Sequence, residues 1–373
     1  MVRSSCCSSA WIGSPTSTAG SSGATSRWSL QRRACDRGSL HVEAAETRGS
    51  AGGSGPRPVG PARAQPRGTG SRAHGAIPGA SRPDRLRDPG VNRVDGATQV
   101  YAVLGHPVQH SQSPVIQNAA FQAAGMNAVY IALEVPAPRL EEALRGLHAA
   151  GVSGLSVTTP HKEAAFALTH DRTAEAEQAR AVNTLRRERD GWRGHATDGI
   201  GFLAWIAEEG IEMRGRRLIV IGAGGATRAI VPKLVTLCPE AIHVVSRNAE
   251  RARAVARSAT EPDGRARITA AALGDRAIER GGDPWNVLIR AIPVEPVSAE
   301  EDSWWDQHGP GAVVLDLNYG ARATAARTRA RERGLRYEDG GALLIHQGAA
   351  SFEFWTGKRP SVAVMKEALR GSA

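Results

Sequence analysis

The sequence predicts an α/β protein with two domains, each built on parallel strands covered by helices. From residue 98 onward, short β-rich runs alternate with amphipathic helical segments. A strand, a glycine turn and a helix then follow one another at 216–237, which marks the start of a second unit. A length of 373 residues suits about two domains as well.

The first unit begins with an apolar run at 99–105, which predicts a buried strand. A helix is expected over 113–125, because Pro114 suits its first turn and Gly125 its end. The remaining expected elements are strands at 128–135 and 153–159, helices at 136–151 and from Pro160, a hairpin turning at 189–191, and a helix at 200–210 that leaves the first domain.

The second unit starts with the strand, turn and helix at 216–237. Further strands are expected where apolar β-branched residues cluster, and helices where the apolar residues recur every three to four positions. These elements are strands at 241–247, 286–292 and 312–319, and helices at 249–259, 341–357 and 361–369. We find no internal repeat.

The net charge of +10 lies mostly in the first 96 residues, which carry a surplus of eight positive charges. The remainder is nearly neutral, which argues against a nucleic-acid-binding face. The first 96 residues are rich in Gly, Pro, Arg and Ser without apolar periodicity, so we expect a disordered basic tail, either a targeting segment or a stretch upstream of the real start.

Cysteine usage and hydropathy bear on the compartment. Cys238 is the only cysteine after the tail, so the body cannot contain a disulfide framework, and a cytoplasmic setting is expected. No apolar run approaches the roughly 18 residues of a membrane span. We expect no membrane, nucleic-acid or metal partner, and a monomer or homodimer.

Lys162 is one of only four lysines among 47 basic residues. Arginine stays protonated at any working pH, whereas a lysine amine can be tuned to exchange protons. Lys162 is therefore a candidate for proton transfer. The alternative is a solvated lysine in the first turn of a helix.

The glycine turn predicts a dinucleotide site. Its residues follow a strand and open a helix, where a pyrophosphate can approach backbone N–H groups: Gly222, Ala223, Gly224, Gly225 and Ala226. After the next strand, where an NAD-binding unit would place an acidic residue, stand Ser246 and Arg247, with Arg251 one turn later. Arginines there favour the 2′-phosphate of NADP over NAD.

Several polar residues of the first unit fall at strand ends or loops. They are Ser111, Ser113, Thr158, Asn183 and Asp198. Each alone is more often a cap or a turn residue. Because ligands of open sheets bind beyond the carboxyl ends of strands, the group together suits a small polyhydroxylated substrate.

At these residues the sequence resembles the shikimate dehydrogenase family. The motifs "GHPVQHSQSP", "GLSVTTPHK", "AVNT", "TDGIGF", "GAGGATRA", "SRNAERA", "LDLNY" and "LLIHQGAASFEFWTG" occur in the family's order across about residues 100–370. The resemblance implies an enzyme that uses NADPH to reduce 3-dehydroshikimate reversibly to shikimate. It implies a substrate-binding domain over 97–204 completed by C-terminal helices in 340–373, and a Rossmann-type NADP domain over 205–339.

The resemblance also assigns roles. Lys162 matches the family's catalytic lysine and Asp198 its acidic partner. The residues matching substrate-holding side chains are Ser111, Ser113, Thr158, Asn183, Tyr319 and Gln347. The glycine turn matches the pyrophosphate loop, and Arg247 and Arg251 match 2′-phosphate contacts.

The sequence departs from the family at two places. Where the family usually has an asparagine, this chain has Ser156. The shorter serine side chain reaches less far toward a substrate hydroxyl. The family also has the segment Asn-Ala-Thr-Pro followed by Gly-Met. This chain has Arg-Ala-Ile-Pro at 290–293, with neither Gly nor Met after it. We therefore expect a cation at Arg290 and a branched alkyl side chain at Ile292 near the cofactor.

Three other functions remain open. A paralogue acting on quinate or a related cyclohexane acid would keep the same residues. A non-catalytic shikimate- and NADP-binding sensor is suggested by the two departures, although the Lys162–Asp198 pair opposes it. A dehydrogenase for another substrate such as a folate is opposed by the Ser111/Ser113 loop and Gln347.

Overall fold

The computed structural model describes residues 94–259, 267–275, 284–293 and 297–372. Of the tail predicted over 1–96, all but the last three residues lie outside these ranges. Those three belong to a turn in which the Asp95 carboxylate accepts a hydrogen bond from Asn127 Nδ2 at 3.0 Å. The described fold therefore includes Asp95, slightly before the expected start at residue 97.

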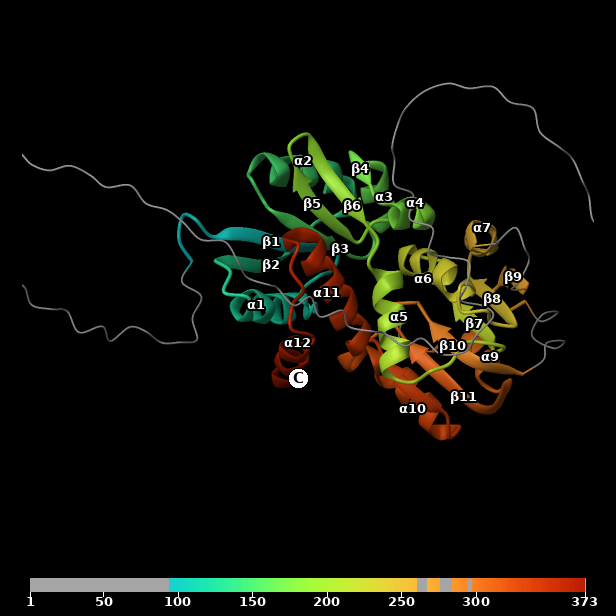
Figure 1. Cartoon of the computed structure of the whole chain (residues 1–373). Coiled ribbons are helices and arrows are strands. Elements are labelled where there is room, and N and C mark those ends of the chain that lie inside the picture. The colour runs from blue at the N-terminus through green and yellow to red at the C-terminus, as the bar shows by residue number, and fades with distance from the viewer. Residues whose placement is uncertain (1–93, 260–266, 276–283, 294–296, 373) are drawn as a thin grey trace, which may run out of the picture. The chain divides into compact units, whose positions relative to one another are not determined.

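The first sheet contains six strands in the order β2-β1-β3-β5-β6-β4 (Figure 1). The strands are β1 (Gln99–Gly105), β2 (Ala128–Glu134), β3 (Gly154–Val157), β4 (Asp171–Arg172), β5 (Thr184–Glu188) and β6 (Gly191–His195). β1 pairs in parallel with β2 and β3, whereas β5 runs antiparallel to β3 and β6. The predicted mostly parallel sheet and its hairpin are confirmed.

Helices cover both faces of this sheet. Their bounds are α1 (Ser113–Ala123), α2 (Leu140–Ala149), α3 (Lys162–Ala167), α4 (Ala174–Ala179), α11 (Gly341–Thr356) and α12 (Val362–Gly371), with a 3-10 turn η1 (Ala137–Arg139) before α2. One core joins the sheet to α2, α3 and α4, and the other joins it to α1, α11 and α12. The C-terminal helices thus return to the first domain as expected. β4 and α4 were not predicted, because elements of two and six residues are too short to show a period.

The second sheet is entirely parallel, in the order β12-β11-β10-β7-β8-β9. Its strands are β7 (Arg217–Ile221), β8 (Ala241–Ser246), β9 (Arg267–Ala272), β10 (Trp285–Arg290), β11 (His308–Asp316) and β12 (Arg336–Asp339). Counted from β7, this is the doubly wound order 3-2-1-4-5-6, whose switch point lies between β7 and β10. The edge strands β9 and β12 were missed, because neither has an apolar run.

Helices cover both faces of the second sheet too (Figure 1). They are α5 (Asp198–Glu208), α6 (Gly225–Val235) and α7 (Ala249–Ala259) on one face, and α9 (Ala299–Trp305) and α10 (Thr324–Glu332) on the other, with a 3-10 turn η2 (Gly320–Ala323) before α10. Phe202 and Trp205 of α5 are fully buried in this core, so α5 packs on the second sheet. Its first residue, Asp198, is a polar residue of the first domain. The described helices include none that is long and apolar enough to cross a membrane.

Candidate active site

A cavity of about 790 Å³ lies among the loops at the ends of the strands of both sheets. The eight side chains predicted for catalysis and substrate binding all line it: Ser111, Ser113, Thr158, Lys162, Asn183, Asp198, Tyr319 and Gln347. Of the predicted cofactor residues, Ala226 is among the lining residues, beside Ala291, Ile292 and Pro293. The fold therefore gathers residues separated by more than 200 positions around one space.

Lys162 and Asp198 form an ion pair within this cavity. Lys162 Nζ donates to Asp198 Oδ2 at 2.5 Å, and the two side chains are 16% and 9% exposed. Lys162 is the first residue of α3, and Asp198 is the first residue of α5, where the positive helix end favours a carboxylate. The Lys162 amine thus adjoins the open space of the cavity, and the Asp198 carboxylate holds it in place.

Asn183 links this pair to the rest of the cavity. Its amide nitrogen donates to Asp198 Oδ1 at 2.9 Å and to Gln347 Oε1 at 3.2 Å. Its amide oxygen accepts from the backbone N–H of Thr197 at 2.7 Å, which fixes the amide orientation. Both Asp198 oxygens therefore have partners, and the carboxylate cannot rotate freely.

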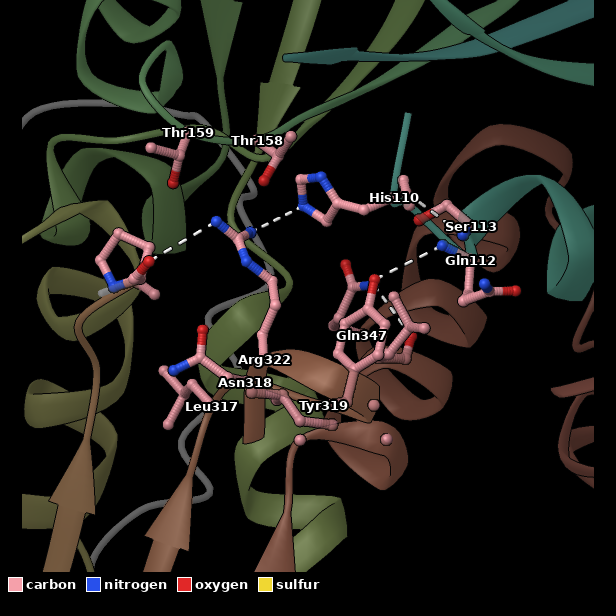
Figure 2. A pocket seen from close by; sticks show the side chains of 18 of the residues that line it. His110, Gln112, Ser113, Thr158, Thr159, Leu317, Asn318, Tyr319, Arg322 and Gln347 are labelled. Atoms are coloured by element: carbon pink, nitrogen blue, oxygen red, sulfur yellow. Dashed lines mark hydrogen bonds between the residues drawn. The ribbon is translucent and has the colours of Figure 1, made fainter. Parts of the chain in front are cut away.

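A second group of polar side chains lies at the other end of the cavity. Tyr319 OH accepts from the backbone N–H of Gln112 at 3.4 Å, and Ser111 Oγ accepts from the backbone N–H of Ser113 at 3.3 Å (Figure 2). Burial raises the pKa of Tyr319 above its ordinary value, while hydrogen bonds to Gln112 and Ser111 act in the opposite direction. Tyr319 is therefore a neutral hydrogen-bonding phenol at working pH.

The glycine turn fits a pyrophosphate. Gly224 precedes α6 without any side-chain cap, and a Cβ built on it would meet nothing within 4 Å, so there is open space beside the uncapped start of the helix. Gly222, at φ +117°, passes so close to Ala291 that a Cβ would lie 2.6 Å from the Ala291 carbonyl oxygen. A Cβ on Gly225 would lie 2.8 Å from Lys162 Cβ, so the turn adjoins α3.

The candidate 2′-phosphate residues lie at the end of β8 and in the first turn of α7. Arg247 is exposed, and Ser246 Oγ accepts from the backbone N–H of Asn248 at 3.4 Å. The Arg251 guanidinium donates to a carboxylate oxygen of Glu163, the residue that follows Lys162. Arg228 of α6 approaches the other oxygen of Glu163 at 3.8 Å. Glu163 therefore connects α3 to two helices of the second sheet.

The expectation of a cation near the cofactor at Arg290 is wrong. Arg290 is fully buried, its Nε donates to Glu301 at 2.7 Å, and its Nη1 lies 3.4 Å from Asp316 Oδ2. Successive residues of a strand point to opposite faces, so Arg290 shares the face of Leu288, which packs against α9 and α10. Ile292, in contrast, lines the cavity as expected, 3.1 Å from a Cβ built on Gly222.

Arg322 and His110 are cavity residues that the sequence did not single out. Arg322 Nη1 lies 2.8 Å from His110 Nε2, and both residues line the cavity (Figure 2). Arg322 lies in an Ala- and Arg-rich stretch, in which several arginines have a similar local sequence context. Only its contact partners distinguish it.

Comparison with known proteins identifies one family. The family model of the shikimate dehydrogenase substrate binding domain matches residues 103–185, and that of the shikimate 5′-dehydrogenase C-terminal domain matches 343–370. Proteins named shikimate dehydrogenase (NADP(+)) from Methanopyrus kandleri and a Synechocystis strain are each 39% identical, over 74% of this chain and 96% of their own length. The structure of shikimate 5-dehydrogenase from Thermus thermophilus, in complex with NADP(H) and shikimate, has a TM-score of 0.63 at 31% identity and covers 74% of this chain and all of that one.

A glycine turn at the switch point of a doubly wound sheet, next to a lysine–aspartate pair in a cavity, defines a dinucleotide-dependent dehydrogenase. The relatives fix the group within this class, because 39% identity extends over almost their entire length. The chain belongs to the shikimate dehydrogenase family.

Proposed function

We propose that this chain catalyses the NADP-dependent, reversible reduction of 3-dehydroshikimate to shikimate. The observation that carries the proposal is the Lys162–Asp198 pair, 2.5 Å apart in a cavity lined by six further polar side chains of the family pattern. The glycine turn supports it, since a Cβ on Gly225 would touch Lys162 and the two functional regions are therefore adjacent.

NADPH would supply the hydride when bound, and the residues of the chain would handle the proton. Hydride addition to a ketone leaves an alkoxide, to which Lys162 Nζ donates a proton; in the reverse direction the amine recovers it. Asp198 holds the amine in place and balances its charge, and Asn183 holds Asp198. Arginine could balance the charge but could not exchange the proton.

The remaining cavity residues would position the substrate. The hydroxyls of Ser111, Ser113 and Tyr319 suit its carboxylate, and Thr158, Asn183 and Gln347 suit its ring hydroxyls. For the cofactor, the uncapped first turn of α6 suits the pyrophosphate, while Ser246, Arg247 and Arg251 suit the 2′-phosphate. NAD lacks that phosphate, so the proposal includes a preference for NADP.

The test is nicotinamide absorbance with purified protein, in which shikimate or quinate is paired with NADP⁺ or NAD⁺. The variant is Lys162→Met, and Lys358→Met is the control because Lys358 is exposed and outside the cavity. Turnover of shikimate with NADP⁺ that only the first variant loses supports the proposal. Faster turnover of quinate would favour the paralogue, and shikimate binding without turnover would favour the sensor.

We also infer a cytoplasmic protein that works as a monomer or homodimer on small molecules. The cysteine distribution supports this compartment, because the body after residue 96 contains the single Cys238. Gel filtration with light scattering would decide between the two assembly states.

A further inference from the structure

We propose that Arg322 binds the substrate carboxylate and selects for acidic substrates, as a cation added to the hydroxyl groups of Ser111, Ser113 and Tyr319. This inference rests on the proposed function, since it names a residue that determines specificity in the same cavity. It assigns a role to a side chain that neither the family pattern nor the sequence motifs single out.

The position of Arg322 is set by the turn that follows β11. It lies in η2, three residues after Tyr319, and its side chain extends into the cavity (Figure 2). Nη1 donates to His110 Nε2 at 2.8 Å, and Nη2 lies 3.5 Å from the Pro293 carbonyl oxygen. The guanidinium is thereby oriented between a loop of the first domain and the loop after β10.

Arg322 has no carboxylate partner within the described part of the chain, although other cavity cations do. Lys162 pairs with Asp198, and Arg327 pairs with Asp339. Arg370 also lacks a described carboxylate partner, but no described hydrogen bond orients its guanidinium. Arg322 therefore combines a fixed position with an uncompensated charge, which suits an anionic ligand group.

The neighbours of Arg322 leave that charge intact. Burial lowers the pKa of His110, and the positive charge of Arg322 lowers it further, so the imidazole is neutral and accepts from Nη1. Arg322 contacts His110, the residue before Ser111, and lies in η2 three residues after Tyr319. The guanidinium thus lies at the same end of the cavity as the hydroxyls proposed for the carboxylate.

A guanidinium matches a carboxylate geometrically, because two parallel N–H groups can reach both oxygens. Neutral hydroxyls can bind an ester or an amide nearly as well as an acid, whereas a guanidinium favours the acid. Arg322 is exposed, so solvent weakens the effect. We expect a change of about tenfold in discrimination, in line with one charge-assisted hydrogen bond.

The experiment compares shikimate with its uncharged methyl ester in three variants, with NADP⁺ as the oxidant. Arg322→Gln removes the charge, and Arg322→Lys keeps it without the planar fork. Arg331→Gln is the matched control, because Arg331 is exposed on α10, the helix that follows η2, and lies outside the cavity. Calorimetric binding of shikimate to each protein without cofactor, where no turnover can occur, accompanies the kinetics.

Arg322→Gln should raise KM and Kd for shikimate about tenfold with a smaller effect on kcat, and leave the values for the ester unchanged. Arg322→Lys should restore part of the loss, and Arg331→Gln should match the parent. Equal losses for acid and ester, or no loss in Arg322→Gln, would refute the assignment. If the parent protein neither converts nor binds shikimate, the proposed function fails at that step, and the carboxylate assignment fails with it.

Discussion

Replacing Arg290 by methionine should destabilise the protein strongly, although Arg290 is outside the cavity. Its guanidinium lies between Glu301 at 2.7 Å and Asp316 at 3.4 Å, and all three side chains are completely buried. The substitution leaves two carboxylates buried without their cation. Removing one partner of a buried ion pair typically costs about 3–5 kcal/mol in the free energy of unfolding.

The loss should depend on pH. Burial raises the pKa of Glu301 and of Asp316, and the charge of Arg290 opposes that rise. Without Arg290 both pKa values increase further. A carboxyl group with a raised folded-state pKa contributes stability below its unfolded-state pKa and loses it as the pH rises through the folded-state value. Arg290→Met should therefore be less destabilised near pH 5 than near pH 8.

Thermal and urea unfolding across this pH range measure the effect. A loss of about 3–5 kcal/mol corresponds to a fall in Tm of roughly 10 °C, at 2–4 °C per kcal/mol. Arg290→Met with Glu301→Leu is the compensated variant and should recover much of the loss, because Asp316 keeps hydrogen bonds from Asn318 and Tyr337. Equal stability of Arg290→Met and the parent, or a loss that grows at acidic pH, would refute this reasoning.

Three further predictions concern the cofactor side and the tail. Gly222→Ala should lower stability by about 1–3 kcal/mol and weaken NADP⁺ binding, because the new Cβ meets the Ala291 carbonyl at a positive φ. The control Gly146→Ala, in open space on α2, should do neither. Calorimetry measures the binding, and thermal unfolding measures the stability. Glu163→Gln should release Arg251 and tighten NADP⁺ binding about twofold to fivefold without changing NAD⁺ binding. Fluorescence titration measures both affinities, and an equal change for the two cofactors would contradict this prediction. A chain of residues 94–373 should keep the Tm and turnover of the full chain, and a fall in either would mean that the tail supports the fold.

Local pattern was sufficient for many of the elements and for part of the candidate site. Apolar runs and caps located the central strands of both sheets, and the glycine turn between a strand and a helix located the switch point. Polar residues at strand ends could be grouped from their positions in the sequence, because parallel strands present their carboxyl ends at one edge. The catalytic and binding roles of these residues remain predictions, although the cavity contains all eight.

The sequence by itself determined the fold class, because it follows from periodicity and turn chemistry within short windows. It also indicated the polar cavity residues at strand ends, whereas Tyr319 and Gln347 followed only from the family resemblance. Tertiary structure alone decided the partners of the arginines. Arg290 is followed closely by cavity residues, yet the alternation of side chains along the strand points it toward Glu301 of α9. Arg322 is one of many arginines in its stretch, yet it contacts His110, which lies more than 200 residues earlier in the sequence. The function of a charged side chain depends on which distant groups the fold brings within a few ångströms of it, and no local pattern contains that information.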